Sequence, residues 1–196
     1  IQQTHFQIIL KKGAFMKKII YAATEKYSKS SIMMHWLVVL LMIGTYAFIE
    51  LRVLFPKGEP MRDIFKDIHY WLGLLVLILI FPRIWSIFKT PAPEVVPAPS
   101  MVDKIMAHSM HAFLYIFMIV MPILGWILLS AEGKPIPFFG LNLPALVAPD
   151  KEFSKTIKEI HEIIGTIGYY AIGLHTLAAL YHHFVKRNNM IKRMLP

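Results

Sequence analysis

Four long apolar segments constrain the fold of this 196-residue chain more than any other feature. They run from about residue 32 to 49, 68 to 88, 105 to 129 and 160 to 185, and each is close to the ~20 residues that a helix needs to cross a bilayer. Inside a bilayer the backbone must satisfy its hydrogen bonds internally, as helices do. The sequence therefore predicts an all-α fold, a transmembrane four-helix bundle, in which Pro82 and Pro122 kink the second and third helices.

Composition agrees with a membrane protein and excludes several functional classes. Only 17% of the residues are charged and 56% are hydrophobic, whereas soluble domains carry about 25% charged residues. The net charge of +9 comes from basic residues that flank the apolar segments without forming a patch, so we expect no nucleic-acid partner. The chain has no cysteine, which excludes disulfides, iron–sulfur clusters, thiolate zinc sites and covalently attached c-type haem.

The chain divides into one domain and one extension. We expect residues 25–196 to form the transmembrane domain. Residues 1–24 carry four lysines among apolar residues and no clear signal-peptide cleavage pattern. We interpret them as a basic N-terminal extension. Either it is not native to the protein, and Met16 is the more natural start, or it lies as an amphipathic segment on the membrane surface.

The distribution of basic residues predicts the orientation of the four spans. With both termini in the cytoplasm, the cytoplasmic segments hold thirteen basic residues and the external segments hold eight. Because cytoplasmic loops are enriched in lysine and arginine, this arrangement is favoured over its reverse. We therefore expect cytoplasmic N and C termini.

Four histidines lie in or at the ends of the apolar segments, where an ionisable side chain is costly unless it has a function: His35, His69, His161 and His175. The last two stand fourteen residues apart on one predicted helix, about 40° short of four full turns and about 21 Å apart along the axis. They therefore share a face, with one near each edge of the membrane. In the predicted orientation His35 matches the depth of His175, and His69 matches the depth of His161.

Each depth-matched pair offers two neutral imidazoles, which together fill both axial positions of a haem iron. No position is then left for oxygen, which favours electron transfer over oxygen activation. We predict two non-covalent haem b groups between the helices, held by the pairs His35/His175 and His69/His161. Glycines follow two of these histidines near the same face and would let a macrocycle approach the backbone: Gly165 and Gly168 after His161, and Gly73 after His69.

Other ionisable residues suggest supporting roles. Arg83 follows a long uncharged stretch, and its guanidinium suits a haem propionate, although a flanking basic residue is equally consistent. We interpret His108, His111, His182 and His183 as a quinone or proton site at the cytoplasmic side, because histidine titrates near neutral pH, with membrane-interface anchoring as the alternative. His182 or His183 is also an alternative haem ligand in place of His175. A haem bound by one methionine and one histidine stays open as well.

Between residues 25 and 196 the chain contains four segments in this order: SSIMMHWLVVLLMIGTYAFIELR, DIHYWLGLLVLILIFPRIW, AHSMHAFLYIFMIVMPILGW and HEIIGTIGYYAIGLHTLAALYHHF. In them the chain resembles the bacterial cytochrome b561 family. The resemblance implies a multi-pass diheme cytochrome b of the bacterial inner membrane, with haem ligands at His35, His69, His161 and His175. It also implies an oxidoreductase that passes electrons from a small external donor, superoxide in one branch of the family, to ubiquinone.

Two other functional classes stay open. A membrane-anchor cytochrome b subunit of a periplasmic hydrogenase or dehydrogenase would share the fold but act only with a soluble partner, and the short external segments argue mildly against a large docking surface. A haem-free transporter or scaffold is the second class, but the span centres carry almost no charge and the halves show no symmetry. A homodimer, the donor and the haem potentials are left open by the sequence.

Overall fold

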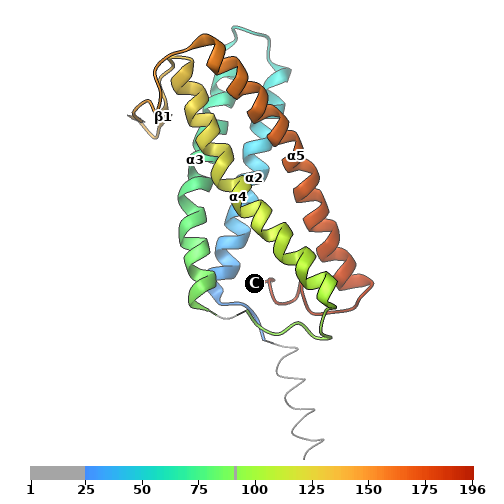
Figure 1. The fold of residues 1–196 in the computed structure, drawn as a ribbon. Helices are drawn as coiled ribbons and strands as arrows, with labels where there is room; N and C mark the ends of the chain where they lie inside the picture. The colour runs from blue at the N-terminus through green and yellow to red at the C-terminus, as the bar shows by residue number, and fades with distance from the viewer. Residues whose placement is uncertain (1–24, 91) are drawn as a thin grey trace, which may run out of the picture.

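Four long helices make up most of this computed structural model, which describes residues 25–90 and 92–196 (Figure 1). They are α2 (Lys29–Leu51), α3 (Pro60–Lys89), α4 (Met101–Ala131) and α5 (Lys151–Phe184). A short helix, η1 (Arg52–Leu54), follows α2, and a hairpin of β1 (Pro137–Phe138) and β2 (Leu141–Asn142) lies between α4 and α5. The predicted all-α four-helix architecture is confirmed, whereas the predicted extension at residues 1–24 lies outside the described residues.

All four helices are long and apolar enough to cross a membrane, and each is longer than its apolar segment indicated, most clearly α3 and α5 at their first turns. Helix α3 begins at Pro60, where a proline fits the first turn because the N–H groups there have no helical partner. Helix α5 begins at Lys151, and the Asp150 side chain caps it by accepting a hydrogen bond from the backbone N–H of Phe153 at 2.9 Å. An apolar pattern reveals only the part of a helix inside the hydrocarbon, so these polar first turns were not predicted.

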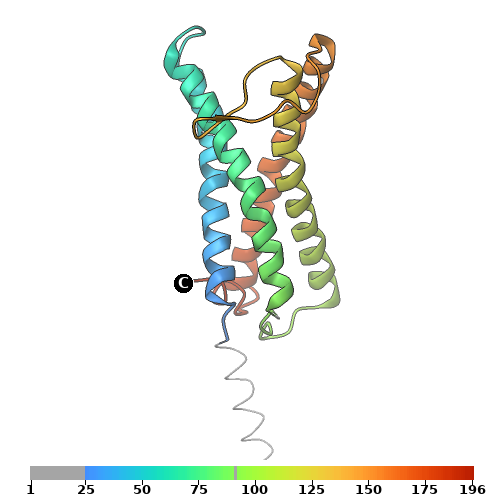
Figure 2. The ribbon, with the colours of Figure 1, turned by 90° about the vertical axis from the view of Figure 1, so that its left-hand side faces the viewer.

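The helices run side by side along the long axis of the molecule (Figures 1 and 2). Helix α2 packs on α3 and α4 packs on α5, with a further contact between α3 and α4. We call the end with residues 25–28, 92–100 and 185–196 the terminal end, and the end with residues 52–59 and 132–150 the hairpin end. Apolar side chains on the outer surface, such as Leu40, Ile78, Ile116 and Leu177, are exposed in the protein alone, as expected for helices that face lipid.

The last residues of the chain fold back across the terminal end. Arg193 is buried, and its guanidinium donates a hydrogen bond to the carbonyl of Pro93 and lies 5.0 Å from the ring centre of Tyr27. The indole nitrogen of Trp36 on α2 donates to the carbonyl of Met194 at 2.8 Å. The C-terminal segment thereby ties the start of α2 to the connection between α3 and α4, and it covers the terminal end of the bundle.

Candidate functional site

Two histidine rings face each other near the hairpin end. His69 lies on α3 and His161 lies on α5, with ring centres 6.3 Å apart and ring planes at 76°. Two imidazoles that bind one iron from opposite sides, each with a nitrogen at about 2 Å, have ring centres about 6 Å apart. The structure thus brings the predicted pair together at a spacing that a single metal ion could bridge.

The nitrogens of these two rings are in different states. The Nδ1 of His69 donates to the backbone carbonyl of Thr45 on α2 at 2.8 Å, which leaves Nε2 with a free lone pair. Ligating histidines commonly donate their second nitrogen to a carbonyl in this way. The Nδ1 of His161 is buried without a hydrogen-bond partner among the described residues, beside Gly125 of α4. A buried unsatisfied nitrogen is costly, so the His161 ring is suited to bind a further group.

A cavity of about 530 Å³ lies between the helices at these two rings. This volume falls within the usual range for cofactor sites. Residues from all four helices line it, among them Gly73, Gly125 and Gly165 beside the histidines, and Tyr46 and Phe117 toward the middle of the bundle. Glycine in the wall lets a flat macrocycle approach the helix backbone closely.

The charged part of the cavity lining is largely neutralised by pairing. Four basic residues (Arg52, Lys66, Lys134, Lys158) and three acidic residues (Glu50, Glu132, Glu162) line it. Lys134 pairs with Glu132 at 2.7 Å and Lys158 pairs with Glu162 at 2.7 Å, while the Tyr169 hydroxyl donates to Glu50 at 2.8 Å. A cavity with apolar walls and a charged lining at one end suits a haem, whose body is apolar and whose propionates are charged.

A second cluster lies toward the terminal end, where each helix contributes one member. Arg83 of α3 is buried, and its Nη2 donates to Nδ1 of His35 on α2 at 2.9 Å. On the other helix pair, the rings of His111 and His175 have centres 5.2 Å apart at 79°. His35 lies within electrostatic range of both rings. The predicted pair His35/His175 therefore belongs to one cluster, but the ring in contact with His175 is His111.

Arg83 holds His35 instead of flanking the helix at the membrane surface. A guanidinium can only donate, so Nδ1 of His35 accepts and its proton resides on Nε2, which leaves this ring no free lone pair for a metal ion while the contact persists. The guanidinium also lies 5.9 Å from the ring centre of Tyr115 on α4. Arg83 thus orients His35 within the bundle, and its predicted contact with a haem propionate stays a prediction. Binding of a metal ion by His35 would require this hydrogen bond to break, which would free the guanidinium for another acceptor.

Replacing Arg83 with glutamine should weaken haem retention at this cluster by about 10- to 100-fold, because a hydrogen bond to a charged group such as a propionate contributes about 1.5–3 kcal/mol. Haem per chain after extensive gel filtration measures the loss. Lys89→Gln is the control, since Lys89 is an exposed cation in the last turn of the same helix. Equal haem retention in the two variants would contradict a contact between Arg83 and a haem propionate.

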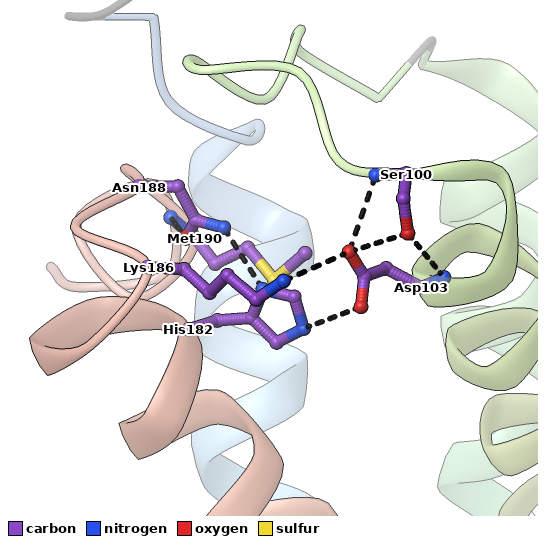
Figure 3. Close-up of polar contacts among 6 residues, drawn as sticks. All are labelled: Ser100, Asp103, His182, Lys186, Asn188 and Met190. Carbon is purple, nitrogen blue, oxygen red and sulfur yellow. Dashed lines mark hydrogen bonds and ion pairs between the residues drawn. The ribbon is translucent and has the colours of Figure 1, made fainter.

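A polar network joins α4, α5 and the C-terminal segment at the terminal end (Figure 3). Asp103 in the first turn of α4 lies 3.8 Å from Nε2 of His182 and 3.7 Å from Nζ of Lys186. The Asn188 side-chain amide donates to Nδ1 of His182 at 3.0 Å, and Ser100 forms a capping box with Asp103. His182 is mostly buried in this network, with 13% of its side chain exposed, so it lies between the aqueous surface and the bundle interior.

The four histidines predicted as a quinone or proton site separate into different environments. The structure brings His111 into the terminal-end cluster and His182 into the network with Asp103. His108 is exposed on α4, and its Nδ1 donates to a carbonyl of its own helix. The Nδ1 of His183 is buried without a hydrogen-bond partner in the described part of the chain. Among the described residues, only His111 and His182 of these four therefore have a ring contact or ion pair with another helix.

Sequence reasoning missed the groups that position these histidines. Thr45 acts through its backbone carbonyl, which no side-chain pattern reveals. Gly125 and Phe117 become relevant only through the antiparallel pairing of α4 with α5. Both residues follow from the sequence only if the alignment of the third span against the fourth is known. Packing between segments distant in sequence sets that alignment.

Known proteins resemble this chain over almost its entire length. The family model described as prokaryotic cytochrome b561 matches residues 26–196. Cytochrome b561 homolog 1 of Escherichia coli K12 is 37% identical over 172 residues, which cover 88% of this chain and 98% of the relative. A Yersinia pestis protein named "Probable superoxide oxidase CybB" is 37% identical over 173 residues, which cover 88% and 97%. Cytochrome b561 homolog 2 of Escherichia coli K12 is 26% identical over 87% of this chain and 92% of the relative.

Proposed function

The chain belongs to the prokaryotic cytochrome b561 family, and from this premise we propose that it conducts electrons across the bacterial inner membrane through two haem b sites. Family membership makes it a b-type membrane cytochrome with an electron-transfer role. We assign one haem to His69 and His161, and the other to His35 and His175. The observation that carries this proposal is the 6.3 Å spacing of the first two rings at a cavity of about 530 Å³.

The two sites lie at different depths of the bundle, as a transmembrane conduit requires. Their α5 ligands are separated by about 21 Å along the helix axis. We place the terminal end in the cytoplasm, because most basic residues of the connecting and terminal segments belong to it. The electron then enters at the hairpin end and leaves at the terminal end.

The residues of each site would bind the haem, orient its ligands and shield it from water. With haem bound, the two imidazoles of each site would hold the iron and leave no position for oxygen, which favours electron transfer over oxygen activation. The Thr45 carbonyl orients His69 at one site, and Arg83, released from His35, would pair with a propionate at the other. A bound haem supplies the one-electron couple of its iron at each site. Buried apolar residues of the cavity wall, such as Leu74, Val76 and Leu129, would shield the haem at the hairpin-end site from water.

We further propose superoxide as the donor and ubiquinone as the acceptor. The support for superoxide is the name of the Yersinia pestis relative, which is 37% identical to this chain, whereas ubiquinone is the acceptor that the resemblance in sequence implies. Two superoxide ions release two electrons and become two molecules of oxygen, and ubiquinone takes up two electrons and two protons to become ubiquinol. His182 lies at the terminal end with Asp103, where it is placed to pass protons from the cytoplasm toward the acceptor.

A reduced-minus-oxidised absorption spectrum of the purified chain, with haem quantified, tests the proposal. We expect a b-type spectrum with about two haems per chain, from the two assigned ligand pairs. With superoxide generated enzymatically, the protein should reduce a soluble ubiquinone analogue. Haem without superoxide-dependent reduction would favour the membrane-anchor subunit, which a co-purifying soluble redox protein would identify. A haem-free protein would contradict the proposal.

A further inference from the structure

A third layer of residues lies midway between the two histidine sites. Three residues of α5 are seven positions apart, about 20° short of two turns, so they share one face at steps of about 10 Å: His161, Gly168 and His175. Helix α4 runs antiparallel and places one residue opposite each of them, namely Gly125, Phe117 and His111. The middle layer therefore consists of Gly168, Phe117 and what packs on them.

Packing in this middle layer is tight and involves three helices. Gly168 is buried, and the space that a Cβ would occupy there is taken by the Phe117 ring and the Tyr46 hydroxyl of α2. A Cβ at this position would lie 2.7 Å from Cε2 of Phe117, closer than real Cβ contacts allow. Phe117 is only 5% exposed. The missing side chain of Gly168 is thus what lets two aromatic residues reach the axis between the sites.

The polar atom of this layer is already satisfied. The Tyr46 hydroxyl donates to the backbone carbonyl of Gly165 at 2.9 Å, which fixes the ring against α5. Phe117 and Tyr46 both line the hairpin-end cavity, at the side nearer the middle of the bundle. The two aromatic rings of this layer therefore lie between that cavity and the terminal-end cluster. Their packing leaves no room for one more carbon at Gly168.

We propose that Phe117 and Tyr46, packed on Gly168, form the bridge through which the electron passes between the two sites. This inference rests on the two-site assignment of the proposed function. One electron leaves the hairpin-end site and one arrives at the terminal-end site, while no bond forms or breaks and no proton moves. Electron tunnelling falls steeply across empty space and less steeply through packed atoms, and the π electrons of an aromatic ring mediate it better than an aliphatic side chain does. Two rings that close the gap therefore speed the transfer.

The test replaces the Phe117 ring by a side chain that is aliphatic and similar in size, as in Phe117→Leu. The two haems are first distinguished spectrally with His161→Ala and His35→Ala. Stopped-flow reduction of the protein fraction that carries two haems should then show the terminal-end haem reduced in a separate, slower phase in Phe117→Leu. Phe113→Leu is the matched control, because its ring stacks on that of Phe117 at 6.2 Å but is 38% exposed and outside the layer.

The second bridge residue allows an independent comparison. Tyr46→Phe keeps the ring and loses the hydroxyl, so transfer should stay near the wild-type rate, whereas Tyr46→Leu should slow it. Wild-type transfer in both leucine variants, with both haems bound, would overturn the bridge. If Phe117→Leu loses a haem, Tyr46→Leu decides the question, and wild-type transfer in its two-haem fraction would overturn the bridge. Absence of haem from the wild-type protein would instead refute the proposed function itself.

Discussion

Replacing His161 with alanine should lower the haem content from about two to about one per chain, because each iron needs both of its axial imidazoles. The ring lost is the one whose buried Nδ1 lacks a partner and whose centre lies 6.3 Å from that of His69. The remaining haem should keep a b-type spectrum, since His35 and His175 lie at the other end of the bundle. Pyridine haemochrome analysis of the purified variant measures this directly.

His108→Ala is the matched control for this experiment. His108 is another histidine of the bundle, but it is exposed, and its Nδ1 donates to the carbonyl of Lys104 on its own helix. That variant should retain the wild-type haem content. A His161→Ala protein that still binds as much haem as His108→Ala would show that the ligands of the hairpin-end site lie elsewhere.

Replacing Gly168 with alanine should destabilise the protein by about 1–3 kcal/mol, the usual cost of forcing an extra carbon into a packed interior. The new Cβ would collide with the Tyr46 hydroxyl and with the Phe117 ring, which is held within the bundle. Alanine is intrinsically better than glycine in a helix by about 1 kcal/mol, so a net loss would identify steric conflict as the larger effect. Thermal unfolding of the detergent-solubilised chain measures the change.

Gly173→Ala provides the comparison within the same helix. Nothing lies within 4 Å of a Cβ built at Gly173, so this substitution should be neutral or stabilising by up to about 1 kcal/mol. Combining Gly168→Ala with Phe117→Leu should recover part of the lost stability, because residues in contact couple by about 0.5–3 kcal/mol. Equal stability of the two single alanine variants would contradict the tight middle layer.

The amino-acid sequence was sufficient to predict the four spans and the candidate histidines. Hydrocarbon demands about 20 apolar residues per helix and penalises ionisable side chains, so both features appear as patterns along the chain. The common face of His161 and His175 also follows from sequence, since the turn per residue is a local property of one helix. The polar first turns of α3 and α5 were missed because they lie beyond the apolar pattern.

Only the tertiary structure decided which of these residues meet. It places His111 against His175, turns Arg83 inward onto His35, and packs Phe117 on Gly168. These contacts depend on how far each helix is rotated and shifted relative to its neighbours. That register is set by the fit of many side chains from segments distant in sequence, whereas periodicity within one helix is local. The sequence alone therefore determined the helices and the candidate ligands, and interhelical packing decided their neighbours.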